Sequence, residues 1–106
     1  MRDLLTLSAR ALVAELAAKR VSVEAVMEAT LARVAEVNGA LNAIVSMQTA
    51  DALLAEARAM DKSGPEGPLA GLPTAIKDLH AATGMVNTQG SPIFADTISA
   101  LDDPHV

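Results

Sequence analysis

One lysine stands inside an apolar run, directly after a Gly-Leu-Pro corner. Lys77 follows Ala75 and Ile76 in the stretch GLPTAIKDLH, which begins at Gly71. Lysine is among the residue types least often buried, because removing an unpaired ammonium group from water is costly. The residues alone allow two interpretations. Lys77 either reaches water from a strand edge along its aliphatic stem, or is buried, loses proton affinity and can act as a base.

Hydroxyl-bearing residues and glycines follow the lysine and could serve a buried amine. The hydroxyl groups nearest in sequence belong to Thr74, Thr83, Thr88 and Ser91. Spacing by itself does not choose between the two interpretations of Lys77. We expect Asp78 to accept hydrogen bonds from nearby backbone amides or to pair locally, in preference to a catalytic role. His80 is expected to be structural or exposed.

Two short motifs and the sequence before them resemble one enzyme family. Gly71–Asp78, GLPTAIKD, is similar to a lysine-bearing block of the amidase signature family, and Thr88–Ser91, TQGS, is similar to its T-x-G-S block. The preceding stretch RVSVEAVMEATLARVAEVNGALNAIV is also similar to that family. The resemblance covers about Leu5–Val106 and identifies the chain as an N-terminal portion of such a protein. One departure is Leu79, where many members have asparagine.

The resemblance implies a fold and a reaction. The fold is α/β, a mixed sheet covered by helices on both sides, of which this mostly helical chain supplies helices and the first one or two strands. The reaction is hydrolysis of C–N amide bonds by a serine–cis-serine–lysine triad. Lys77 matches the lysine, while Thr88, Gly90 and Ser91 match positions that shape the binding site around it. Both triad serines belong to a downstream segment that is absent from these residues, and no cofactor is implied.

Helices must position this block, and three are predicted. They cover roughly residues 8–19, residues 22–37 with an end at Asn38-Gly39, and residues 49–61, each with an apolar stripe. Thr6 or Ser8 is the expected cap of the first helix and Ser22 that of the second, which Asn38-Gly39 should end. Residues 41–47 form a strand or an extended connector, and residues 74–79 a short buried strand. We interpret residues 1–106 as part of one amidase domain, with a helical part (1–62) and a lysine and loop segment (69–106).

Composition excludes several classes of protein. The net charge is −5 with scattered basic residues, which argues against a nucleic-acid groove. The chain has no cysteine, and its histidines, His80 and His105, are far apart in sequence, so no metal site is expected. Neither a signal peptide nor a membrane span is apparent, which favours the cytoplasm. A mean hydropathy of +0.32 in so short a chain predicts self-association or cover by a missing C-terminal portion.

Three functions stay open at this point. The first is an amidase-family hydrolase acting on a small-molecule amide, with this truncated chain inactive alone. The second is the glutamine-hydrolysing subunit of an amidotransferase, which belongs to the same family. The third is a truncated, inactive paralogue whose apolar helix faces serve as a self-association or interaction module.

Overall fold

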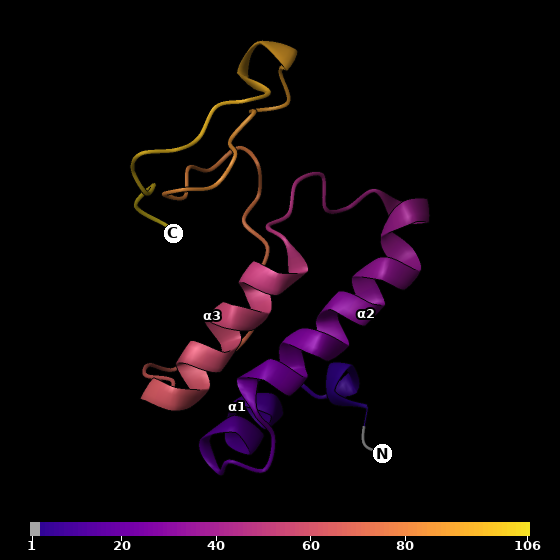
Figure 1. Ribbon diagram of the computed structural model, residues 1–106, viewed down its shortest axis with the longest axis vertical. Coiled ribbons are helices and arrows are strands. Elements are labelled where there is room, and N and C mark those ends of the chain that lie inside the picture. Colours follow the sequence, from indigo (N-terminus) through magenta and orange to yellow (C-terminus); the bar gives the residue numbers. More distant parts are fainter. Residues whose placement is uncertain (1–2) are drawn as a thin grey trace. The chain divides into compact units, whose positions relative to one another are not determined.

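The regular structure of the chain is helical. The computed structural model describes residues 3–106 and divides the chain into two compact units, one ending at Pro73 and the other spanning Thr74–Val106. The first unit holds a short 3-10 helix, η1 (Leu4–Thr6), and three α-helices, α1 (Ala9–Ala17), α2 (Val23–Leu41) and α3 (Ala50–Ser63) (Figure 1). The second unit holds a single 3-10 turn, η2 (Pro92–Phe94). Each helix in the described part of the chain is too short or too polar to cross a bilayer.

Hydroxyl side chains cap all three α-helices: the sequence predicts Ser8 and Ser22, and Thr49 is a cap that the sequence analysis did not name. Ser8, Ser22 and Thr49 accept hydrogen bonds at 3.2, 3.0 and 3.2 Å from the amides of Ala11, Ala25 and Ala52, respectively. Each cap satisfies one of the amides that a helix start leaves unpaired. The three predicted helices and their starts are therefore confirmed.

The predicted end of the second helix is wrong. α2 continues through Asn38-Gly39 to Leu41 and ends at Asn42, which has the left-handed φ of 49°. Asn38 does not leave the helix, because its side chain binds Ile44 twice: Ile44 N–H donates to Oδ1 and Nδ2 donates to Ile44 O, both at 2.9 Å. These bonds hold the segment after α2 as an irregular connector, which answers the alternative left open for residues 41–47.

The core of the first unit is small and formed by α1, α2 and α3. Its buried side chains are Leu12, Leu16, Val23, Val26 and Ala57, with Leu72 and Met60 among the half-buried residues that pack against them. Gly71, the first residue of the lysine block, also packs on this core. A Cβ on Gly71 would lie 3.1 Å from Leu16 Cδ1 and 3.2 Å from Val23 Cγ2, and its φ of +87° favours glycine.

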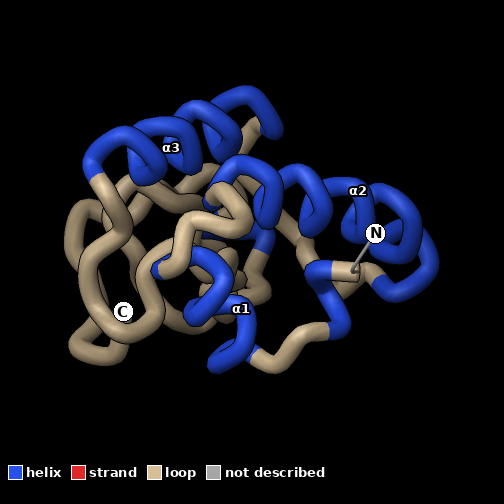
Figure 2. Tube along the Cα trace, turned by 90° about the horizontal axis from the view of Figure 1, so that it is seen from below, coloured by secondary structure: helices blue, strands red, loops and turns tan. Residues whose placement is uncertain are grey.

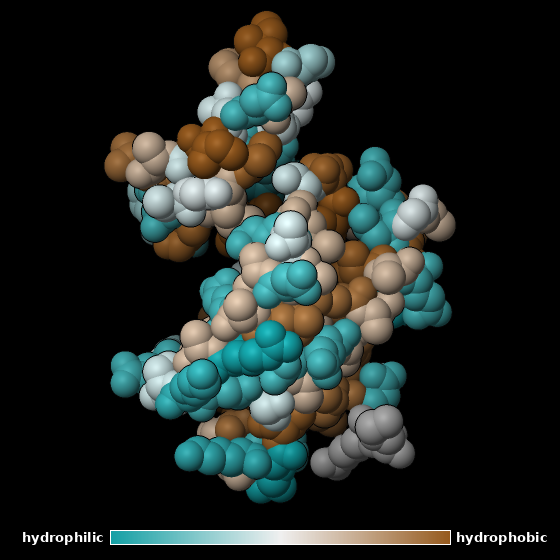
Figure 3. Space-filling view, viewed as in Figure 1, coloured by the Kyte–Doolittle hydropathy of each residue, from teal (hydrophilic) through white to brown (hydrophobic). Residues whose placement is uncertain are grey.

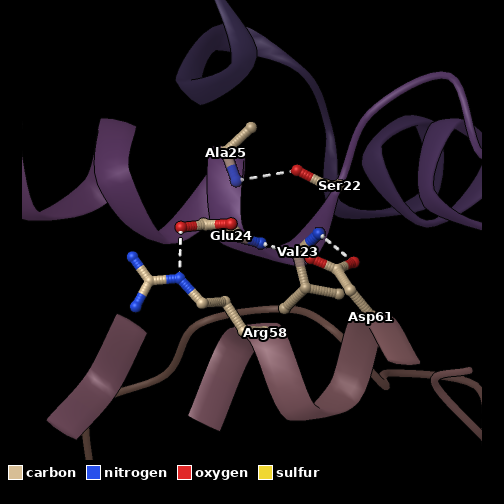
Figure 4. Close-up of polar contacts among 6 residues, drawn as sticks. All are labelled: Ser22, Val23, Glu24, Ala25, Arg58 and Asp61. Atoms are coloured by element: carbon tan, nitrogen blue, oxygen red, sulfur yellow. Dashed lines mark hydrogen bonds and ion pairs between the residues drawn. The ribbon is translucent and has the colours of Figure 1, made fainter. Parts of the chain in front are cut away.

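A carboxylate from α3 caps the N-terminus of α2. Asp61 accepts hydrogen bonds from the amides of Val23 at 2.8 Å and Glu24 at 3.1 Å (Figure 4). Arg58, one turn earlier on α3, pairs with Glu24 at 2.6 Å. With Ser22, three of the four unpaired amides at the start of α2 have side-chain acceptors. α2 and α3 are thus joined by specific polar contacts as well as by apolar packing.

The described residues contain no strand, so the predicted strand at residues 74–79 is wrong for this chain (Figure 2). The chain is irregular from Leu72 to Lys77 and then turns. A strand needs a neighbour for its amides and carbonyls, and residues 3–106 offer this segment none. One isolated antiparallel bridge joins Val86 and Ile98 in the second unit. The mostly helical character predicted for the chain is observed, and the mixed sheet remains a prediction.

Candidate functional site

Lys77 stands where the irregular stretch enters a tight turn. His80 N–H donates to Lys77 O at 2.8 Å and closes the turn over residues 77–80. The side chain is exposed, as are those of Ala75 and Leu79 on either side of it. Residues 74–106 bury only Ala82 and Asn87, so they lack the apolar mass to enclose a lysine. Of the two interpretations of Lys77, these 106 residues taken alone therefore show the exposed one.

Asp78 joins the lysine block to the T-x-G-S block. Its carboxylate accepts from Thr88 N–H at 2.7 Å and from the Thr88 hydroxyl. Its backbone carbonyl accepts from Gln89 N–H at 3.2 Å. The Thr88 hydroxyl bond, with the Thr88 amide bond next, lowers the pKa of Asp78 below its ordinary value. The expectation that Asp78 caps backbone amides is confirmed.

The T-x-G-S block forms a tight turn of its own. Ser91 N–H donates to Thr88 O at 3.0 Å, and the two residues between them, Gln89 and Gly90, have φ values of 52° and 72°. Two positive φ values in succession are typical of a type I′ turn, whose second central position suits glycine. Gly90 N–H donates to the Thr88 hydroxyl at 3.1 Å, so Thr88 links Asp78 to the turn.

Asn87 is a contributor that the sequence analysis missed. It is 6% exposed, and its Nδ2 donates to Asp78 O at 2.8 Å and to His80 O at 3.1 Å. Both acceptors lie in the turn that follows Lys77. The signal in the sequence is weak, since an asparagine next to Thr88 reads as an ordinary loop residue.

Two aspartates near the end of the chain bind backbone amides of the second unit. Asp102 accepts from Thr83 N–H at 2.6 Å, which lowers its pKa, and Asp103 accepts from Ala81 N–H at 2.8 Å. His80 Nδ1 lies 3.5 Å from Asp103 Oδ2, and its half-exposed ring meets that of His105 edge to face at 5.2 Å. His80 thus has the structural role expected of it. Within residues 3–106, no group of three His, Cys, Asp or Glu side chains could hold a metal ion.

The structure therefore brings together part of the predicted site. Asp78, Thr88 and Gly90 form one hydrogen-bonded cluster beside Lys77. Ser91 lies at its edge, and its hydroxyl caps η2 by accepting from Ile93 N–H at 3.3 Å. In the described residues, the Lys77 amine makes no hydrogen bond or ion pair. A primary amine on a fixed turn can accept or donate a proton, but bond cleavage requires a nucleophile beside it.

Comparison with known proteins identifies the family. A family model described as Amidase matches residues 25–106, which include both motifs and the whole cluster. The chain belongs to the amidase family. It is similar to proteins named as glutamyl-tRNA(Gln) amidotransferase subunits in Cutibacterium acnes, 39% identical over 106 residues, and in Acidothermus cellulolyticus, 42% identical over 106 residues. The protein of the same name in Renibacterium salmoninarum is 43% identical over 105 residues.

Each of these comparisons covers most of the amidase-family chain and a minor part of its relative. The alignments span 96% of this chain and 21%, 21% and 20% of the three relatives, respectively. The chain therefore spans about a fifth of the length of the curated relatives it matches. Membership of the family supports an amide-bond enzyme in general terms.

Proposed function

We propose that this chain is the lysine-bearing N-terminal portion of an amidase-family enzyme that cleaves C–N amide bonds. The observation that carries the proposal is the family match over residues 25–106, a range that includes Lys77. By its resemblance to the family's lysine-bearing block, Gly71–Asp78 would supply the lysine. The hydrogen bonds that Asp78 accepts from Thr88 support it, because they join two motifs that a working site would need side by side.

In this proposal Lys77 is the base of a serine–cis-serine–lysine triad. Its neutral amine takes a proton through the bridging cis-serine, so that the other serine can attack the amide carbonyl and form an acyl-enzyme. The same lysine then helps to protonate the leaving amine and to activate water. The two serines come from sequence outside these residues. That sequence would also cover Lys77, since burial is what makes a lysine a base near neutral pH.

The substrate we favour is glutamine, hydrolysed within a tRNA-dependent amidotransferase. The names of the relatives carry this choice, since several at 39–43% identity are called glutamyl-tRNA(Gln) amidotransferase subunits. Other subunits would then be its partners, in the cytoplasm. A small-molecule amide hydrolase of the same family is the alternative, and it uses the same lysine with a different binding pocket. Direct nucleic-acid contact is not expected of residues with a net charge of −5.

A second candidate function is an inactive interaction module. Exposed apolar side chains favour it, because they occur in both units: Leu41 and Leu69 in the first are 68% and 70% exposed, and Ile93 and Leu101 in the second are 86% and 78% exposed. Figure 3 shows such side chains as brown surface in each unit. The same exposure is expected of a domain portion that lacks the rest of its domain, so it does not displace the enzymatic proposal.

A chimaeric enzyme, called the graft below, tests the proposal. These residues replace the matching segment of the Cutibacterium acnes relative, and release of ammonia from glutamine is measured. We expect activity in the graft, a loss of orders of magnitude in Lys77→Ala, and nearly the same loss in Lys77→Arg, because guanidinium stays protonated and cannot accept a proton. Lys62→Ala, at the end of α3, is the matched control and should keep the rate. If Lys77→Arg released ammonia at a near-normal rate, Lys77 would not be the base.

A further inference from the structure

The turn that carries Lys77 is fixed through its neighbour Asp78. Both the carboxylate and the backbone carbonyl of Asp78 are bound by residues 87–89: Thr88 binds the carboxylate, while Asn87 Nδ2 and Gln89 N–H bind the carbonyl at 2.8 and 3.2 Å. We call Asp78, Asn87 and Thr88 the aspartate clamp. Fixing the side chain and the peptide of one residue leaves little rotational freedom for the residue before it.

Lys77 is held on its backbone and free at its amine. Its carbonyl accepts from His80 N–H at 2.8 Å, and the carbonyl of His80 in turn accepts from Asn87 Nδ2 at 3.1 Å. The turn over residues 77–80 is thus bound at Lys77, Asp78 and His80, while the Lys77 side chain is exposed. This is the arrangement expected of a reacting group whose direction is set before its partners arrive.

Asp78 is poorly placed to be a proton donor or acceptor in a reaction. Both carboxylate oxygens already accept from Thr88, one from its amide and the other from its hydroxyl. Thr88 is engaged on both sides as well, since its hydroxyl also accepts from Gly90 N–H at 3.1 Å. The polar groups of Asp78 and Thr88 are hydrogen-bonded to each other and to Gly90. The clamp can therefore affect a reaction only by positioning Lys77.

We propose that Asp78 and Thr88 are positioning residues, and that the aspartate clamp sets the direction in which the Lys77 amine leaves the backbone. The proposal rests on the proposed function of Lys77 as a base. It adds that the lysine block needs the threonine of the T-x-G-S block as its anchor, and that Thr88 acts through Asp78 and not by contact with substrate.

The first test uses the 106-residue chain itself and needs no activity. Thr88→Val keeps the shape of residue 88 and removes its hydroxyl, so amide hydrogen exchange at His80, which reports the bond to Lys77, should quicken about tenfold or more. Thr88→Ser should restore slow exchange. Asp102→Asn is the matched control, a carboxylate bound to a threonine amide in the same unit, and should leave His80 unchanged. Unchanged exchange at His80 in Thr88→Val would overturn the clamp.

The second test measures turnover in the graft described above. Thr88→Val and Asp78→Asn should lower kcat about ten- to hundredfold with KM unchanged, because a charge-assisted bond that fixes the base is lost. Thr88→Ser should recover most of the rate, and Asp102→Asn should keep it. An inactive wild-type graft would refute the proposed function, whereas the exchange test decides the clamp itself. Loss of activity in Lys77→Ala with normal kcat in Thr88→Val, or a raised KM alone, would overturn only the positioning role.

Discussion

At the scale of single residues, the neighbour of the lysine carries more of the local structure than the lysine does. Lys77 is exposed and contributes one carbonyl to its turn, whereas Asp78 gathers donors from Asn87, Thr88 and Gln89. A motif that is recognised by its lysine is thus held in shape by the aspartate after it. The asparagine expected at position 79 is replaced by an exposed leucine, Leu79, which the clamp does not use.

The ionisation of Asp78 should report its contact with Thr88. The Thr88 hydroxyl and amide lower the pKa of Asp78, so the folded value lies below the unfolded value of about 3.9. The contribution of Asp78 to stability is therefore complete above pH of about 4 and is lost as the pH falls through the lower folded pKa. We expect carboxyl NMR titration to give Asp78 a lowered midpoint, and Thr88→Val to raise it.

Asp102 supplies the comparison for this titration. Its pKa is also lowered, in its case by Thr83, so its midpoint should stay low in Thr88→Val and rise in a variant that removes the Thr83 hydroxyl. If the titration midpoint of Asp78 did not change in Thr88→Val, the two side chains would not be in contact in solution.

At the scale of elements, α2 depends on a carboxylate that belongs to another helix. Asp61 lies in the last turn of α3, where a negative charge is unfavourable for its own helix dipole. It accepts instead from the first amides of α2, where a negative charge is favourable (Figure 4). The contact converts an unfavourable position in one helix into a cap for the next.

Loss of this cap should destabilise the helical unit. We expect Asp61→Ala to lower the free energy of unfolding by about 1–2 kcal/mol, as the removal of other side-chain caps does. Arg58→Ala should cost less, at most about 1 kcal/mol, because its ion pair with Glu24 is half exposed. Urea unfolding followed by helical circular dichroism measures both. Glu56→Ala, an exposed change on the same helix, is the control. An equal loss of unfolding free energy in Glu56→Ala would mean that the effect of Asp61→Ala is not due to the cap.

Local rules predicted the helices and missed what joins them. Ser8 and Ser22 could be assigned as caps because a cap and its amide lie within one turn of each other. The contact of Asp61 with Val23 spans 38 positions, and no pattern near either residue indicates it. The stop predicted at Asn38-Gly39 failed for the same reason, since Ile44, outside the helix, engages the Asn38 side chain.

The candidate site divides in the same way. The motifs named Lys77, Thr88, Gly90 and Ser91 as site residues, which stays a prediction, and the capping role of Asp78 followed from its residue type. The partner of Asp78, ten positions away, and the central place of Asn87 required the fold of the loop. The strand predicted at residues 74–79 could not form, because a strand is defined by its neighbour and residues 3–106 supply only the bridge between Val86 and Ile98.

At the scale of the whole molecule, the main feature is the exposure of apolar side chains. Large apolar side chains stand out in both units, and the buried core of the first consists of five residues. A chain with half its residues hydrophobic has too little interior here to hide them.

The isolated chain should therefore associate or bind apolar probes. At micromolar concentration we expect light scattering to give a mass above 10.9 kDa, or a hydrophobic dye to brighten on binding. A monodisperse monomer that binds no dye would contradict this expectation.

The isolated chain should also hydrolyse no simple amide above background. A lysine that is exposed and lacks a nucleophile has the means for proton transfer but not for acylation. Turnover by highly purified material that disappears in Lys77→Ala would show that a serine within these residues had been overlooked.

Gly71 has a consequence for how this stretch of protein can change over evolutionary time. Every missense change there adds a Cβ against Leu16 and Val23 and demands a left-handed backbone from a residue that disfavours it. Substitution at Gly71 is therefore strained, so a lineage that keeps Leu16 and Val23 should also keep this glycine. The loop between Gly64 and Pro68 has open space at both of its glycines, so insertions in a lineage should collect there and spare the block that follows.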